Sequence, residues 1–198
     1  YRQHLAAFAS MINRLHNEAG IQKSLPGKTY EDFRDAGMAA LDGICSKWEP
    51  LKRLVPTDAA FVDDSISLIR EQLSGFTGSG LVASHNDICN ANWLLSEDGK
   101  LYLIDLDSMS LDDPALDIGA TLWWYYPPDL RPKFLDITSH IDDLEFQERM
   151  RVRMAMHCLN IELPRPNSYD QFDPASFGDN LLDFKAVLAG EENPQGYD

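Results

Sequence analysis

Two features of the sequence predict a mainly α-helical fold that carries a small β-hairpin, an α+β class. Apolar residues recur with helical spacing through most of the chain, most clearly over residues 5–15 and 58–73. One central region instead contains short apolar runs on either side of the dipeptide Asp98-Gly99, a combination typical of a hairpin.

The same criteria give each element in turn. The predicted helices cover about residues 5–15, 30–48, 58–73, 114–126, 129–141, 145–162 and 175–189, and the predicted strands are 81–84 and the two arms of a hairpin over 93–105. We expect one helical domain over residues 1–190, with functional loops at 85–107, followed by a flexible tail over 191–198.

Composition and charge exclude some classes of function. The formal net charge of −15 disfavours nucleic acid as a partner, because phosphates require a basic surface. No apolar run approaches the roughly 20 residues of a membrane helix, so we expect no membrane partner. The 3 cysteines lack CxxC spacing and predict free thiols, hence a cytoplasmic protein. The first residue, Tyr1, suggests a trimmed fragment of a longer chain.

Residues 85–92, with the sequence HNDICNAN, form a polar break between two apolar stretches. Burying such side chains is unfavourable unless they have partners or a function. If Asp98 and Gly99 form a two-residue turn, Asn92 faces Asp105 across the hairpin with Cβ atoms about 5 Å apart. An amide oxygen and a carboxylate at that separation can share a hard divalent cation, typically Mg²⁺.

Two other side chains of this segment are candidates for chemistry. Asp87 lies five residues before Asn92, so its carboxylate could accept a hydroxyl proton from a substrate and orient that oxygen for attack on a phosphoryl group. We expect His85 to brace the loop through hydrogen bonds to the backbone, with a role as general base as the alternative.

Three motifs together resemble the aminoglycoside phosphotransferase and choline kinase family, whose members are small-molecule kinases with a protein-kinase-like fold. The motifs are H-x-D-x-x-x-x-N (His85, Asp87, Asn92), I-D-x-D (Ile104, Asp105, Asp107) and D-P-A-x-D-I-G (Asp113 to Gly119). Their order and spacing both match, and the resemblance extends to the helical frame on either side.

The resemblance implies roles for individual residues. Asp87 would be the catalytic base, and Asn92 and Asp105 would bind the Mg²⁺ ions that hold ATP. Asp107 would have a supporting or metal-binding role. Asp117 would be a buried residue that opens the next helix and anchors the catalytic loop, a position that suits a carboxylate near a helix N-terminus.

The resemblance covers only the C-terminal lobe of the family's fold. Nothing in the sequence matches the N-terminal, mostly β-sheet lobe that carries a nucleotide loop and a phosphate-pairing Lys, so we expect that lobe to be absent from this chain. We therefore expect an incomplete ATP cleft, with ATP and Mg²⁺ as the cofactors.

Several segments leave alternatives open. Asp112 and Asp113 could bind a substrate amine or cap a helix. Trp123 and Trp124, in the run WWYY, could contact a cationic substrate or fill the core. Cys89 could suggest a thiol nucleophile, but no orienting group accompanies it. The glycines at 75–80 lack the lysine of a phosphate loop and favour a simple connection.

Three functions remain. The leading one is an ATP- and Mg²⁺-dependent phosphotransferase acting on a hydroxyl of a small molecule, with cationic acceptors resembling aminoglycosides or choline among the candidates. The others are a non-catalytic module that binds a metabolite or partner, and a metal-dependent hydrolase built around Asn92, Asp105 and Asp107. The acceptor and the oligomeric state leave no pattern in the sequence.

Overall fold

The computed structural model describes residues 2–25, 30–78, 80–165 and 172–197. Its elements in chain order are α1 (Leu5–Asn17), α2 (Ala19–Ser24), α3 (Phe33–Trp48), α4 (Pro56–Gly75), β1 (Val82–Ser84), β2 (Trp93–Leu95), β3 (Leu101–Leu103), β4 (Ser110–Asp112), α5 (Pro114–Tyr125), α6 (Arg131–Ile137), α7 (Leu144–Glu162), α8 (Phe177–Asn180) and α9 (Leu182–Ala189). The predicted mainly helical α+β class is confirmed.

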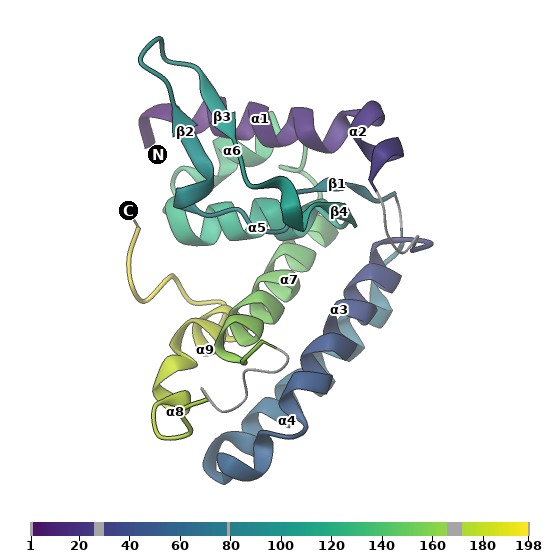
Figure 1. The fold of residues 1–198 in the computed structure, drawn as a ribbon, viewed down its shortest axis with the longest axis vertical. Helices are drawn as coiled ribbons and strands as arrows, with labels where there is room; N and C mark the ends of the chain where they lie inside the picture. The colour runs from purple at the N-terminus through teal and green to yellow at the C-terminus, as the bar shows by residue number, and fades with distance from the viewer. Residues whose placement is uncertain (1, 26–29, 79, 166–171, 198) are drawn as a thin grey trace.

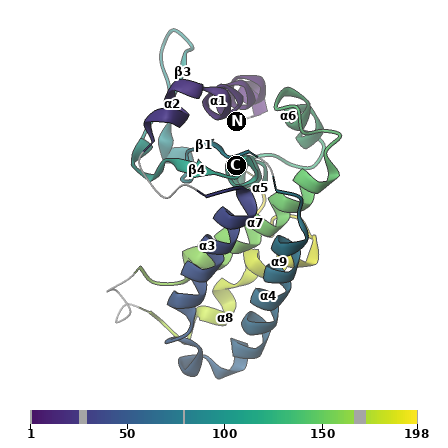
Figure 2. The ribbon, with the colours of Figure 1, turned by 90° about the vertical axis from the view of Figure 1, so that its right-hand side faces the viewer.

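The elements form two groups joined by α7. Helices α1, α5 and α6 lie with the four strands at one end of the molecule, and α3 and α4 run side by side away from it (Figure 1). Helix α7 passes from the first group into the second, where α9 packs against it, and the view turned by 90° shows the same division (Figure 2).

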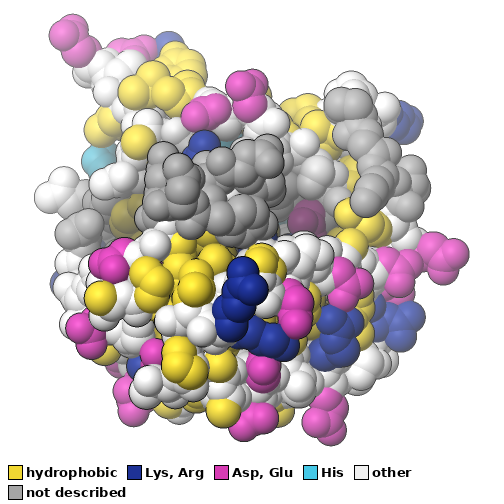
Figure 3. Space-filling view, turned by 60° about the horizontal axis from the view of Figure 1, so that its bottom comes forward, with side chains coloured by type: hydrophobic (Ala, Val, Ile, Leu, Met, Phe, Trp, Pro, Cys, Tyr) yellow, Lys and Arg dark blue, Asp and Glu magenta, His cyan; other side chains and the backbone are white. Residues whose placement is uncertain are grey.

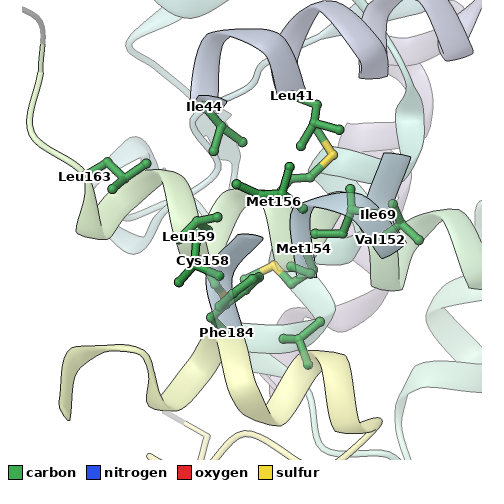
Figure 4. Close-up of a cluster of buried hydrophobic side chains, with 14 of the residues drawn as sticks. Leu41, Ile44, Ile69, Val152, Met154, Met156, Cys158, Leu159, Leu163 and Phe184 are labelled. Carbon is green, nitrogen blue, oxygen red and sulfur yellow. The ribbon is translucent and has the colours of Figure 1, made fainter. Parts of the chain in front are cut away.

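Each group has its own hydrophobic core. In one, apolar side chains of α3, α4, α7 and α9 meet, and Leu41, Ile69 and Leu159 are completely buried (Figure 4). In the other, α1 packs against the hairpin and α5, and the rings of Phe8 and Trp93 lie 4.3 Å apart. Burial of these side chains is the main force that fixes the helices against one another.

Helix boundaries follow local capping. Asp32 accepts hydrogen bonds from the backbone N–H groups of Arg34 and Asp35, so α3 begins later than the predicted residue 30. Asp143 caps α7 in the same way, through the N–H of Phe146. The predicted helix at 129–141 is shorter, the one at 175–189 is divided into α8 and α9, and the short α2 was not predicted.

Two separate two-stranded antiparallel sheets replace the single hairpin that the sequence predicts. The predicted strand before the polar segment is β1, and it pairs with β4, which carries no recognisable strand pattern. Strands β2 and β3 form the predicted hairpin. The β1–β4 pair places the start of the polar segment 85–92 next to the first turn of α5, because β4 leads directly into that helix.

The predicted two-residue turn of the hairpin is wrong. Trp93 pairs with Leu103, and the last pair joins Ser96 to Lys100, which leaves a three-residue loop. Gly99 has a φ of +80°, the left-handed conformation typical of such loops. Asn92 therefore lies opposite Ile104, whose N–H donates to the Asn92 carbonyl at 2.9 Å, and not opposite Asp105.

We expect Gly99→Ala to lower the free energy of unfolding by about 1 kcal/mol, because a Cβ is strained at positive φ. No heavy atom lies within 4 Å of that Cβ, so the cost is conformational rather than steric. Chemical denaturation measures it, with Gly80→Ala, where the space is equally open and φ is not positive, as the matched control. Equal stability of the two variants would contradict the three-residue loop.

The segment after α9, for which the sequence predicted a flexible tail, makes specific contacts up to Tyr197; Asp198 lies outside the described residues. Asn193 is buried and donates from its amide to the carbonyl of Trp123 at 3.1 Å. Gln195 donates to the carboxylate of Asp183 at 2.7 Å. These bonds hold residues 193–195 against α5 and α9.

The surface reflects the acidic composition. Seen from the lower end of Figure 1, acidic side chains are spread widely, while Lys and Arg side chains gather in one part of the face (Figure 3). Among the described helices, none is long and apolar enough to cross a membrane.

Candidate active site

The polar segment 85–92 follows β1 and is fixed by the first turn of α5. The backbone N–H groups of His85 and Asn86 donate to the two carboxylate oxygens of Asp117, at 2.8 and 2.9 Å. Asp117 is 1% exposed, and a carboxylate at that depth requires such donors. Helix α5 therefore holds the start of the loop in place.

Asp117 has a third donor in α1. The Nε2 of His16 lies 2.9 Å from Asp117 Oδ2, and both side chains are buried. Burial alone would raise the pKa of Asp117, but the hydrogen bond and the charge of His16 outweigh it, together with the N–H groups of His85 and Asn86. The pKa of Asp117 therefore lies below its ordinary value of 3.8. The carboxylate is ionised and ties α1, α5 and the loop together.

His85 is completely buried, and its ring makes two backbone hydrogen bonds. Its Nε2 lies 2.9 Å from the carbonyl oxygen of Ile104, and its Nδ1 accepts from the N–H of Asp87 at 3.3 Å. One neutral tautomer, with the proton on Nε2, satisfies both bonds. With both nitrogens used, His85 braces the loop against the end of the hairpin.

Asn86 continues the loop in a left-handed conformation, with a φ of +63°. Asn tolerates this region better than most residues, and here its side chain adds two bonds. The amide nitrogen donates to the carbonyl of Ser108 at 3.0 Å and to the hydroxyl of Ser110 at 2.8 Å. The loop is thereby joined to the segment that follows Asp105.

Asp87 and Asn92 are in direct contact. The Asn92 amide nitrogen donates to the Asp87 carbonyl at 2.8 Å and to the Asp87 carboxylate at 3.1 Å. The Asn92 side chain is 5% exposed, whereas Asp87 is exposed. Because the Asn92 nitrogen faces Asp87, its amide oxygen is left as an acceptor on the other side.

Asp105 follows Ile104 directly, so it is one residue beyond the partner of Asn92 rather than that partner. It has a φ of +60°, a conformation costly for most residues but tolerated by Asp. Strand β3 ends at Leu103, so the alternation of strand side chains does not extend to Asp105. Asp105 and Asp107 are both exposed.

The donor set suits a hard cation. An amide oxygen at Asn92 and a carboxylate at Asp105 are the oxygen ligands that Mg²⁺ takes in proteins, usually with water and substrate phosphates completing its shell. Within the described ranges, no group of three His, Cys, Asp or Glu side chains is close enough to bind a metal.

Asp112 and Asp113, candidates for binding a substrate amine, are occupied by arginines of α7. Asp113 is 1% exposed, caps α5 through the N–H of Ala115, and pairs with Arg149 at 3.0 Å. Asp112 accepts from Arg153 at 2.9 Å. Asp113 thus has the capping role, and its carboxylate is covered by Arg149.

The aromatic run after residue 122 contributes mainly to the core. Trp123 is 7% exposed and belongs to the buried cluster, and Trp124 is half-buried with its ring 6.5 Å from that of Trp123. They lie six or seven residues beyond Asp117 in α5, about 9–11 Å along the helix axis. Cys89 is a half-buried free thiol.

Three residues that build this region were missed by sequence reasoning. His16 lies four residues after the buried Ile12, on the apolar face of α1, so a polar residue in that stripe was a signal that could have been used. Arg149 and Arg153 lie on one face of α7, and nothing local in the sequence indicates which carboxylates they pair with.

The sequence pattern of the phosphotransferase enzyme family matches residues 2–155. The chain belongs to this family.

Solved structures show the same fold. The choline kinase LicA from Streptococcus pneumoniae is similar with a TM-score of 0.67 and 18% identity, over 95% of this chain and 63% of that one. A spectinomycin phosphotransferase, APH(9)-Ia, solved with ADP and spectinomycin, has a TM-score of 0.54 and 12% identity, over 96% of this chain and 65% of that one. The chain thus spans less than two thirds of either structure.

Proposed function

We propose that this chain supplies the catalytic and cation-binding loops of an ATP- and Mg²⁺-dependent kinase that phosphorylates a hydroxyl of a small molecule. The observation that carries the proposal is the contact between Asn92 and Asp87, which orients one carboxylate and one amide oxygen at the same loop. Family membership and relatives solved with AMP or ADP support a nucleotide as the second substrate.

In this proposal Asp87 accepts the proton of the acceptor hydroxyl. The hydroxyl oxygen forms a bond to the γ-phosphorus of ATP while the bond from that phosphorus to the β-phosphate oxygen breaks, and ADP leaves. The amide of Asn92 holds the Asp87 carboxylate, and Asp117 and His85 keep the loop from moving. Catalysis is then mainly the positioning of the acceptor oxygen.

Asn92 and Asp105 would hold Mg²⁺, which neutralises charge on the phosphates when bound. Several exposed apolar side chains lie on the hairpin and beside Asp105. Leu94 and Tyr102 face one another across the hairpin, and Ile104 and Leu106 flank Asp105 in the chain. On an otherwise acidic surface, exposed apolar side chains of this kind favour binding of a nucleotide base or of another segment of protein. The N-terminal nucleotide lobe of the family's fold, which nothing in this sequence matches, would provide that coverage.

We expect Asp105→Asn to weaken the apparent affinity for Mg²⁺ during ATP turnover by at least about tenfold. Asparagine tolerates the left-handed φ of +60° as well as aspartate does, so the fold is retained while the charge is lost. Titration of turnover with MgCl₂, in the natural full-length protein that contains this sequence, measures the change. Asp64→Asn, on the exposed side of α4, is the control, and equal Mg²⁺ dependence of both variants would contradict the role of Asp105.

A non-catalytic binding module has one observation in its favour, the exposed position of Asp87 in a chain that spans less than two thirds of its relatives. In that case the full-length protein would bind ATP or a metabolite and release it unchanged.

A further inference from the structure

A cavity of about 290 Å³ lies between α3 and α7, beside the start of the polar loop. One face of α3, from Ala40 to Lys47, and one face of α7, from Arg153 to Asn160, form its two walls, and Asn86 closes one side. Each helix contributes residues at i, i+3, i+4 and i+7, which is the spacing of one continuous helix face. The volume suits a small metabolite.

The cavity lies beside the start of the polar loop, because its lining residue Asn86 directly precedes Asp87 in the chain. His157 lies in the α7 wall of the same cavity. Burial lowers the pKa of His157, and the negative charge of Asp87 acts against this shift while the nearby Arg153 adds to it. The pKa of His157 therefore lies below its ordinary value of 6.5, and the imidazole is neutral at pH 7.

The charge of the lining is opposite to that of the protein. The chain carries a net charge of −15, yet the cavity is lined by the cations Lys47 and Arg153 and by no Asp or Glu among the described residues. Arg153 is already paired with Asp112. Lys47, in contrast, has no carboxylate within 4 Å among the described residues. Its Nζ donates to the amide oxygen of Asn160 at 2.7 Å.

The surroundings of Lys47 disfavour the charged form of its ammonium group. Burial, followed by the nearby positive charge of Arg165, lowers the pKa of Lys47. A half-buried ammonium with only an amide partner gains stability from an anion placed against it, and a cation there would be repelled.

We propose that this cavity is the acceptor pocket, and that it takes a small hydroxylated acid with its anionic group against Lys47 and its hydroxyl toward Asp87. The assignment rests on the phosphotransferase function proposed above and names its class of acceptor, which differs from the cationic molecules included among the candidates in the sequence analysis. The helices run in the same direction, since Gly37 lies near Arg153 and Lys47 bonds Asn160. His157 and Asn160 are three residues apart in α7, which is about 5 Å along the helix axis. A hydroxyl beside His157 and an anionic group beside Lys47 and Asn160 would be separated by about that distance.

Binding of three probes of similar size tests the proposal without any turnover. They are 4-hydroxybutyrate, the neutral 1,4-butanediol and the cationic choline, titrated into the natural full-length protein and followed by ¹H–¹⁵N NMR spectra. We expect 4-hydroxybutyrate to bind and the other two not to bind in this cavity. Lys47→Gln should weaken the binding of the acid by at least about tenfold, because the charged partner of the anion is lost.

Gly43 offers a steric test with a matched control. It lies in the α3 wall, and a Cβ built on it has no heavy atom within 4 Å, so Gly43→Leu fills the cavity without a clash at Cβ. Gly75, near the end of α4 and outside this cavity, has the same open space. We expect Gly43→Leu to abolish binding of 4-hydroxybutyrate and Gly75→Leu to leave it unchanged, and leucine in place of glycine favours the helix at both positions.

The outcomes separate this proposal from the function on which it rests. Binding of choline equal to that of the acid, no binding of the acid, or binding insensitive to Gly43→Leu would overturn the assignment of the pocket, even if ATP-dependent phosphorylation of a hydroxyl is observed. If 4-hydroxybutyrate binds, and both Lys47→Gln and Gly43→Leu reduce that binding, the result supports the assignment of the pocket, even if no phosphate is transferred.

Discussion

Asp87→Asn should lower the turnover number of the full-length protein by about 10³-fold, because asparagine cannot accept the proton of the acceptor hydroxyl. The change is nearly isosteric at an exposed residue. The shorter hydrogen bond from Asn92, at 2.8 Å, goes to the backbone carbonyl of residue 87, which the substitution leaves in place. We therefore expect the loop to keep its shape and the loss to fall on the chemical step.

Steady-state kinetics measures this effect as separate changes in kcat and KM. A fall in kcat with KM for ATP unchanged within about twofold is expected for a group that acts in the transition state. The matched control is Asp64→Asn, which removes one exposed carboxylate from the outer side of α4. Wild-type turnover in Asp87→Asn would show that residue 87 is not the base.

The second large effect is on stability. We expect Asp117→Asn to lower the free energy of unfolding by about 3–5 kcal/mol, because an amide cannot serve as an ionised acceptor for His16 and two backbone N–H groups at once. For a domain of this size that corresponds to a fall in Tm of about 10 °C. Urea denaturation gives the free energy, with Asp64→Asn as a control that should cost less than about 0.5 kcal/mol.

The pH dependence of this effect has a defined sign. The pKa of Asp117 is lower in the folded protein than its ordinary value of 3.8, so its ionised form stabilises the fold. That contribution is fully present above the ordinary pKa and is lost as pH falls through the lower pKa of the folded state. The stability difference between wild type and Asp117→Asn should therefore shrink below about pH 4. A difference that is constant down to the lowest pH at which both proteins fold would contradict the lowered pKa.

The helical part of the fold could be predicted because its signals are local. Residues 58–73 and 145–162 have apolar side chains at helical spacing, and the observed helices α4 and α7 extend these ranges by one or two residues. Caps such as Asp32 and Asp143 shift a boundary without changing an element. The split of the last helix at Leu181 has no comparable local signal.

The hairpin shows where local signals are not enough. Its existence follows from the apolar runs around Asp98 and Gly99, but its register depends on whether the loop has two residues or three. A single extra loop residue moves the partner of Asn92 from Asp105 to Ile104. Asp105 follows Ile104 in a left-handed conformation, which the pairing arithmetic does not contain.

Partners from distant segments could not be predicted at all. The pairing of His16 with Asp117 joins residues 101 apart in sequence, and that of Arg149 with Asp113 joins residues 36 apart. The cavity proposed as the acceptor pocket likewise arises only when α3 and α7 lie side by side, since Lys47 and Asn160 are 113 residues apart. One sequence without tertiary contacts does not contain these distances.

The measurement that tests the central proposal most directly is ³¹P NMR of the full-length protein with ATP, Mg²⁺ and a panel of hydroxylated acceptors. We expect a phosphate ester resonance from one acceptor that grows in equal amount with ADP, and we expect this resonance to be lost in Asp87→Asn. Release of ADP with inorganic phosphate alone, or binding of ATP with no turnover for any acceptor, would contradict it.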